Sequence, residues 1–176
     1  MAEPIEIDVW QGEIAELEVD AVVVAATESL FMTSGPATSV KRRAGAAVER
    51  AAVEQGPISP GTAVATSGGD LPAPYVIHAV AVGHDRIADT GTLERAVRAA
   101  LAFAVPLQLR RIAIGLLGIE HGAFTPDEAA AILVPAVIDA ARSTPIESVV
   151  LSGAHASEVK ALSDALRAAR AGATPS

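Results

Sequence analysis

The apolar positions of the chain follow two different periods, and each period predicts one kind of element. Short runs rich in Val and Ile, either alternating with polar residues or continuous, predict β-strands. Longer stretches in which apolar residues recur every three or four positions predict α-helices. The predicted strands cover residues 5–12, 19–26, 61–71, 74–83, 110–118 and 146–154, and the predicted helices cover residues 36–55, 92–105, 126–142 and 156–171. Strands that cluster early and then alternate with helices predict an α/β sandwich with a mixed central sheet.

Proline, glycine and small polar residues mark the ends of the predicted helices. Pro36 stands near the first position of one helix, and Thr92 and Thr125 are candidate N-caps of the next two. Gly172 ends the last helix, and the tail at residues 173–176 is expected to fray. These residues set the limits of elements whose existence rests on the apolar pattern.

Length and composition indicate one soluble domain. The 176 residues contain no linker, repeat or low-complexity segment, so we expect a single domain over residues 1–176 with its core at about 5–168. The chain has no Cys, which removes disulfide and thiolate chemistry. Its beginning lacks the pattern of a signal peptide, and no apolar run is long enough to cross a membrane. We therefore expect a cytoplasmic protein that does not bind membranes.

The charge of the chain argues against a general nucleic-acid-binding surface. The net charge is −8 and the isoelectric point is about 4.9, whereas proteins that bind DNA or RNA broadly carry a basic excess. The densest basic cluster, at residues 41–43, falls on a predicted helix and is interpreted as a solvated helix face. A small anionic ligand stays compatible with this charge, because backbone amides and helix N-termini bind anions without adding formal charge.

Two loops are the candidate site on general grounds. Residues 27–35 and residues 118–124 each join a buried strand to a helix. Ligands of open α/β sheets lie outside the carboxyl ends of the strands, where such loops stand. We therefore expect both loops to border one binding site.

The order of motifs resembles the macrodomain, an ADP-ribose-binding α/β/α fold. The segments GEI at 12–14, DAVVVAAT at 20–27 and AG at 44–45 stand where the family has Gly-Asp-Ile, Asp-Ala-Ile-Val-Asn-Ala-Ala-Asn and Ala-Gly. The segments GTAVATSGGDLPAPYVIHAV, from residue 61, and RIAIGLLGIEHGAF, from residue 111, are similar to later parts of the family. The resemblance implies a three-layer α/β/α sandwich with a mixed central sheet.

The resemblance also implies a set of ligand-binding residues. Glu13 would accept a hydrogen bond from the adenine amino group, Ile14 would offer its backbone, and Thr27 would stand beside the distal ribose. The two phosphate loops would contribute Thr33, Ser34, Gly35, Gly118, Ile119, Gly122 and Phe124. The implied partner is ADP-ribose or a related nucleotide, and no cofactor is implied.

Several positions depart from the family pattern. Thr27 replaces an Asn that contacts the distal ribose and serves catalysis in hydrolases, and Ala37 replaces an acidic residue of the hydrolase branch. The Gly-x-Gly of the second phosphate loop is Gly118-Ile119-Glu120, and the carboxylate of Glu120 would repel a diphosphate unless it points away. Ser152-Gly153 stands where many members stack an aromatic ring on the adenine. The departures predict that the fold is kept while the usual chemistry is weakened.

Other catalytic chemistry has few candidates. The four histidines form no HExxH motif or close pair, so no zinc site is expected. Glu120 and His121 are neighbours in the second loop and form a candidate acid/base pair, although His121 is also compatible with an exposed loop residue. His78 lies within a predicted strand and is interpreted as structural.

Three functions stay open from the sequence. The first is a divergent macrodomain that binds ADP-ribose or a related nucleotide without efficient turnover. The alternative is an ADP-ribosyl or O-acetyl-ADP-ribose hydrolase. The further alternative is a protein-interaction module whose cleft is closed by Met32, Thr33 and Ile119. Phe31 and Met32 could line either a pocket or a dimer contact, which leaves room for a homo-oligomer.

Overall fold

A mixed six-stranded sheet forms the centre of the molecule, for which a computed structural model describes residues 3–172. The spatial order is β1-β6-β5-β2-β4-β3; every neighbouring pair is parallel except β3 and β4, which are antiparallel. The strands are β1 (Glu6–Gln11), β2 (Ala21–Ala25), β3 (Ala63–Ser67), β4 (Tyr75–Ala79), β5 (Arg111–Gly115) and β6 (Ser148–Gly153). The mixed sheet predicted from the sequence is confirmed, and the expected fraying of residues 173–176 lies outside the described residues.

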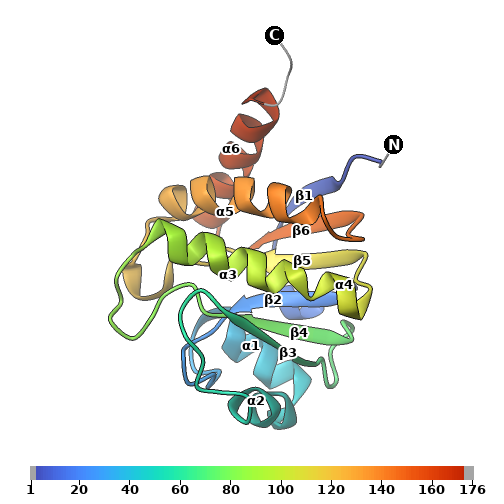
Figure 1. Ribbon diagram of the computed structural model, residues 1–176, viewed down its shortest axis with the longest axis vertical. Coiled ribbons are helices and arrows are strands. Elements are labelled where there is room, and N and C mark those ends of the chain that lie inside the picture. Colours follow the sequence, from blue (N-terminus) through green and yellow to red (C-terminus); the bar gives the residue numbers. More distant parts are fainter. Residues whose placement is uncertain (1–2, 173–176) are drawn as a thin grey trace.

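Helices cover both faces of the sheet. They are η1 (Ile14–Glu16), α1 (Gly35–Ala44), α2 (Ala46–Val53), α3 (Thr90–Ala102), α4 (Ala104–Leu107), η2 (Glu120–Gly122), α5 (Pro126–Ala141) and α6 (Ala156–Gly172). One hydrophobic cluster joins the sheet to α3, α5 and α6, and a second joins it to η1, α1 and α2. Figure 1 shows α3 and α5 crossing the near face while α1 lies behind the sheet. Among residues 3–172, none of the helices has the length and apolarity needed to span a bilayer.

Strand β2 explains why the apolar run at 19–26 has no polar alternation. Ala21 and Val23 pack into the cluster with α3 and α5, and Val22 and Val24 pack into the cluster with α1. All four are at most 1% exposed. A strand in the middle of a parallel sheet is covered on both faces, so both sets of alternating side chains must be apolar.

The predicted helix at 36–55 is in fact two helices. The chain breaks at Gly45, whose φ of +103° is incompatible with a helix, so α1 ends at Ala44 and α2 begins at Ala46. The Gly45 N–H donates to the carbonyl of Lys41 and closes the last turn of α1. The prediction of one long helix was wrong because helical periodicity persists across a single residue that turns the backbone.

Of the two predicted N-caps, Thr92 and Thr125, only Thr125 is confirmed. Thr92 is not the N-cap of its helix, because α3 begins two residues earlier and Asp89 accepts a 3.0 Å hydrogen bond from the Thr92 N–H. A carboxylate is a strong acceptor at this position and shifts the start of the helix. Thr125 is the cap of α5 as predicted: its hydroxyl accepts from the Glu128 N–H at 3.2 Å.

His78 lies inside the sheet, in agreement with its structural interpretation. It is 1% exposed, and its Nε2 is 3.0 Å from Thr66 Oγ1 on the antiparallel neighbour β3. Thr66 donates its hydroxyl proton to the carbonyl of Ser67, so Nε2–H of His78 is the donor to Thr66. Burial lowers the pKa of His78 to about 4, and the ring is therefore neutral at physiological pH.

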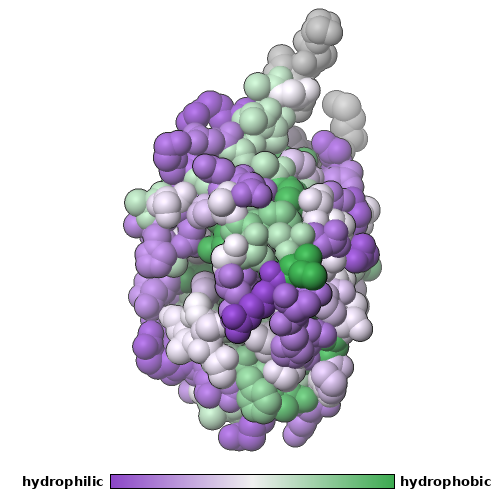
Figure 2. Space-filling model, turned by 90° about the vertical axis from the view of Figure 1, so that its left-hand side faces the viewer, coloured by the Kyte–Doolittle hydropathy of each residue, from purple (hydrophilic) through white to green (hydrophobic). Residues whose placement is uncertain are grey.

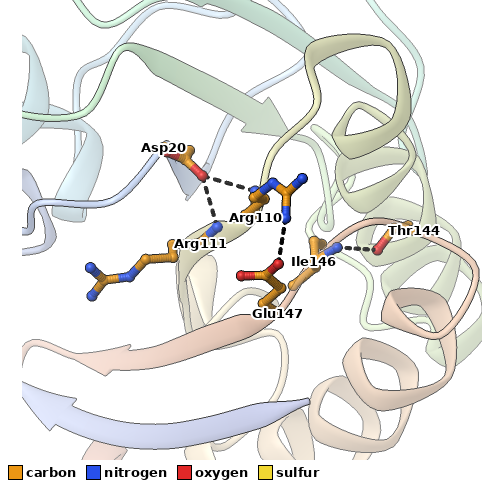
Figure 3. A network of polar contacts seen from close by, with 6 residues as sticks. All are labelled: Asp20, Arg110, Arg111, Thr144, Ile146 and Glu147. Atoms are coloured by element: carbon orange, nitrogen blue, oxygen red, sulfur yellow. Dashed lines mark hydrogen bonds and ion pairs between the residues drawn. The ribbon is translucent and has the colours of Figure 1, made fainter. Parts of the chain in front are cut away.

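Polar contacts hold together the amino ends of three parallel strands (Figure 3). Asp20, just before β2, accepts hydrogen bonds of 2.8 Å from the backbone N–H groups of Arg110 and Arg111, at the start of β5. Arg110 in turn pairs with Glu147, just before β6, at 2.5 Å. This network fixes the register of β2, β5 and β6 at one edge, and the loops at their opposite ends form the candidate site.

Candidate functional site

A cleft of about 780 Å³ lies at the carboxyl ends of β2, β5 and β6. Its walls come from segments far apart in sequence: the turn after β1, the loop from β2 to α1, the loop after β5 and the start of α6. Figure 2 views the molecule from this side and shows apolar surface near the middle with hydrophilic surface beside it. This position is the one expected for ligands of an open α/β sheet.

The first wall of the cleft ends in the amino terminus of α1. Ser34 occupies the N-cap position, but no side chain in the described part of the chain caps the helix, and its first turn carries no acidic residue. Pro36 has no N–H, so Gly35 and Ala37 supply the free backbone donors of this first turn. Unpaired N–H groups and the helix dipole together favour an anion at this end of the cleft.

Met32 does not close the cleft, contrary to one expectation from the sequence. Its side chain is 3% exposed and packs with α1 and the sheet in the second hydrophobic cluster. The cause is local: Leu30, at φ +66°, turns the loop, and the Met32 N–H donates to Glu49 Oε2 on α2 at 2.7 Å. Thr33 and Ile119 line the open cleft without filling it.

The second wall contains Glu120, which folds back onto its own loop. Its Oε2 accepts a 2.6 Å hydrogen bond from the Gly118 N–H, and its Oε1 is buried without a hydrogen-bond partner among residues 3–172. Burial raises the pKa of Glu120, while hydrogen bonds from the backbone N–H groups of Glu120 and Gly118 oppose the rise. The sequence left open whether this carboxylate faces the ligand or points away, and in the structure the loop holds it against its own backbone.

The mouth of the cleft carries an ion pair that the sequence did not predict. Glu13 precedes η1, and its Oε1 is 3.8 Å from Arg42 Nη2 on α1. Both side chains are largely exposed, at 56% and 71%, so the pair is loose and screened by solvent. Arg42 was interpreted as part of a solvated helix face. It lies one turn beyond Thr38 and Ser39, which line the cleft with it, so the helical spacing from Gly35 was the available signal.

The end of β6 and the start of α6 also border the cleft, and apart from Ser152 the side chains that line it there were missed from the sequence. Ser152, His155 and Glu158 line this side. Glu158 is 8% exposed, and its Oε1 accepts a 3.4 Å hydrogen bond from the Ala154 N–H. The sequence pattern showed that the usual aromatic residue is absent here but did not show which side chains replace it. Phe31, on the opposite loop, is 50% exposed and also lines the cleft.

Most predicted site residues come together in this cleft, and three do not line it. The lining residues from the prediction are Glu13, Ile14, Thr27, Thr33, Ser34, Gly35, Ile119, Glu120 and His121. Gly118, Gly122 and Phe124 instead shape the second loop. Gly118 turns the chain at φ +101°, and its carbonyl accepts from the Phe124 N–H at 3.0 Å. Phe124 is 8% exposed in the main core, and Gly122 is exposed at φ +70°.

Within residues 3–172, no group of three or more His, Asp or Glu side chains is arranged to hold a metal ion. His121, the other candidate catalytic residue, is exposed at the rim and adopts φ +56°. The described chemistry of the cleft is therefore that of a helix N-terminus, loop amides, one arginine, two histidines and several carboxylates.

Comparison with known proteins assigns the chain to a family. The family model for the macro domain matches residues 23–133. An O-acetyl-ADP-ribose deacetylase of Klebsiella pneumoniae (strain 342) is 36% identical over 154 residues, which cover 83% of this chain and 87% of that protein. The chain belongs to the macro domain family, as the resemblance in the sequence indicated.

Two further comparisons define the extent of the match. An uncharacterized protein of Mycobacterium tuberculosis (strain ATCC 25618 / H37Rv) is 36% identical over 133 residues, which cover 76% of this chain and only 37% of that protein. The chain therefore spans little more than a third of the length of its mycobacterial relatives. The Trypanosoma brucei macrodomain in complex with ADP-ribose superposes with a TM-score of 0.84 at 21% identity, over 92% of this chain and 69% of that one. This likeness establishes the fold.

Proposed function

We propose that the cleft binds ADP-ribose or a closely related nucleotide without efficient turnover. The observation that carries this proposal is the uncapped amino terminus of α1, which opens onto the cleft beside the loop after β5. Because the chain has a net charge of −8, a nucleotide diphosphate has to be bound by donors other than basic side chains, such as the backbone N–H groups at a helix N-terminus. The cleft volume of about 780 Å³ suits a ligand of this size.

The remaining lining residues fit the parts of such a ligand. Glu13 and the backbone of Ile14 stand at the mouth, where they would accept from and donate to the adenine edge. Thr27, whose hydroxyl is 3.1 Å from Ser29 Oγ, would meet the distal ribose. The exposed ring of Phe31 supplies apolar surface on the same side of the cleft.

The absence of efficient turnover is proposed from the side chains at the reacting end. Thr27 offers a hydroxyl where the resemblance implies an amide, and Ala37 offers no acid. Glu120 is bound to its own loop, so it is poorly placed to activate a water.

Hydrolysis of ADP-ribosyl or O-acetyl-ADP-ribose groups is the second candidate. One observation that favours it is the similarity to the Klebsiella pneumoniae protein that is named O-acetyl-ADP-ribose deacetylase. The other is Glu120, whose pKa is raised by burial as in many general acids and bases. The third candidate, a protein-interaction module, has less support because the cleft is open.

The proposal is tested by calorimetric titration with ADP-ribose and AMP. The single tryptophan, Trp10, gives a second signal, because its ring packs against Gly12 at the edge of the cleft. We expect ADP-ribose to bind with a change in Trp10 fluorescence and no release of products over hours. Release of product at a rate that Glu120→Gln abolishes would favour the hydrolase instead. Absence of heat at millimolar concentrations of both nucleotides would contradict the proposal.

A further inference from the structure

The loop after β5 forms a cradle of backbone amides. Gly118 has φ +101° and the following Ile119 has φ −88°, and this change of sign turns successive N–H groups toward one side. Such a nest of amides binds anions in many proteins. A side chain at Gly118 would lie 2.9 Å from Leu93 Cδ2, so the packing beneath the loop holds this geometry.

The cradle already holds an acceptor of its own, which is the carboxyl group of Glu120. Oε2 lies 2.6 Å from the Gly118 nitrogen, a distance typical of a strong charge-assisted hydrogen bond. The loop thus uses the Gly118 amide on its own carboxyl group.

Holding the Glu120 carboxylate in this position costs free energy. Oε1 is buried and has no hydrogen-bond partner in the described part of the chain, although Glu120 as a residue lines the open cleft. Removing a carboxylate oxygen from water without a new partner destabilises that arrangement. The Glu120 side chain can therefore move from the cradle into solvent when another anion accepts the hydrogen bonds of the amides.

We propose that Glu120 is a specificity-determining residue that occupies the second phosphate position of the cleft and reduces the affinity that the second phosphate of ADP-ribose adds over a single phosphate. This inference rests on the proposed function, because it concerns the nucleotide bound in the same cleft. A single phosphate at the amino terminus of α1 leaves Glu120 in place. A diphosphate must either displace the carboxylate or lie beside it without the amides.

The test compares ADP-ribose with AMP, which carries the same base and ribose but one phosphate. Titrations use the native protein, Glu120→Ala, which frees the amides, and Glu120→Gln, which removes the charge but keeps an acceptor. We expect Glu120→Ala to tighten ADP-ribose by about tenfold or more while AMP changes by less than about threefold, with Glu120→Gln intermediate.

A matched control separates this effect from the general loss of a negative charge. Glu158→Gln removes one carboxylate from the same cleft, but Glu158 accepts from Ala154 and not from the loop amides. Glu158→Gln should therefore change both nucleotides by the same factor. An unchanged ratio of ADP-ribose to AMP affinity in Glu120→Ala and Glu120→Gln, with binding intact, overturns this inference alone. Failure of both nucleotides to bind the native protein and all variants overturns the proposed function as well.

Discussion

Glu49 on α2 accepts a 2.7 Å hydrogen bond from the backbone N–H of Met32, in the loop that forms one wall of the cleft. The other carboxylate oxygen is 2.8 Å from Lys41 Nζ on α1. The hydrogen bond from Lys41, more than that from Met32, lowers the pKa of Glu49. One carboxylate thus joins the two halves of the broken helix to the loop that carries Thr33 and Ser34.

We expect Glu49→Ala to lower the free energy of unfolding by about 1–3 kcal/mol, because the Met32 N–H loses its partner. Lys41→Ala, which removes the ion pair but keeps the bond to Met32, should cost about 1 kcal/mol or less. Urea unfolding measures both values, and hydrogen exchange at residues 31–35 should speed up only in Glu49→Ala. Equal costs for the two variants would show that the ion pair dominates.

The buried His78 predicts a pH dependence of stability. Its pKa is about 4 in the folded protein, against an ordinary value of 6.5, so the unfolded chain binds the extra proton between these values. Stability contributed by the neutral ring is present above pH 6.5 and is lost as the pH falls toward about 4. The full loss would be about 3 kcal/mol, because a difference of one in pKa corresponds to about 1.36 kcal/mol.

His78→Gln, which cannot titrate, isolates this contribution. The difference in unfolding free energy between native and variant protein at pH 8 gives the packing cost of the substitution. That difference should shrink progressively between pH 6.5 and pH 4.5 in urea titrations. A difference that stays constant with pH would mean that His78 has the same pKa in the folded protein as in the unfolded chain.

The sheet and the general place of the cleft could be predicted because both rest on short-range patterns. Val22, Val23 and Val24 form part of a run that only a strand covered on both faces accommodates. The loops at 27–35 and 118–124 follow strands in an α/β order, which places them at the same edge of the sheet.

The finer content of the cleft depends on orientations that sequence patterns do not specify. Arg42 and its neighbour Arg43 are the same residue type, and the helical spacing from Gly35 favours Arg42 only once α1 is known to begin at the cleft. The sequence does not specify whether the Glu120 carboxylate faces the ligand or points away, and the backbone angles at Gly118 direct it onto the loop. Phe124 was predicted to contact the ligand, but it packs into the core because its N–H closes the loop onto Gly118.

The break between α1 and α2 predicts opposite effects for two glycine substitutions. Gly45→Ala places a side chain at φ +103°, where the nearest atom to the new Cβ is Asp70 Oδ2 at 3.9 Å, so the cost comes from the backbone alone. We expect a loss of about 1–2 kcal/mol of stability.

Gly91→Ala is the matched control, because Gly91 lies in the first turn of α3 without a positive φ. There the new methyl group meets the far end of the flexible Arg95 side chain at 3.2 Å and lies in ordinary contact with Asp89 Oδ2 at 3.7 Å, and we expect a gain of about 0.5–1 kcal/mol. Thermal unfolding of the two variants gives the signs directly. A neutral Gly45→Ala would mean that the two helices can join into one.

Arg42 provides the sharpest test of where the ligand lies. Its guanidinium lines the cleft 3.8 Å from Glu13, whereas the adjacent Arg43 is exposed outside it. Replacing either residue by Gln changes the net charge of the protein by the same amount, so long-range effects on an anionic nucleotide cancel between the two variants. Because Arg42 is largely exposed, its contact with a phosphate or a base is partly screened. We therefore expect Arg42→Gln to weaken ADP-ribose binding by about three- to tenfold, measured calorimetrically at low salt, and Arg43→Gln to change it by less than about twofold.

The difference between the variants should shrink at high salt, where the Debye length falls to about 3 Å at 1 M. Equal effects of the two substitutions would place the nucleotide away from the mouth of the cleft, whereas tighter binding in Arg42→Gln would mean that the ion pair with Glu13 blocks the base.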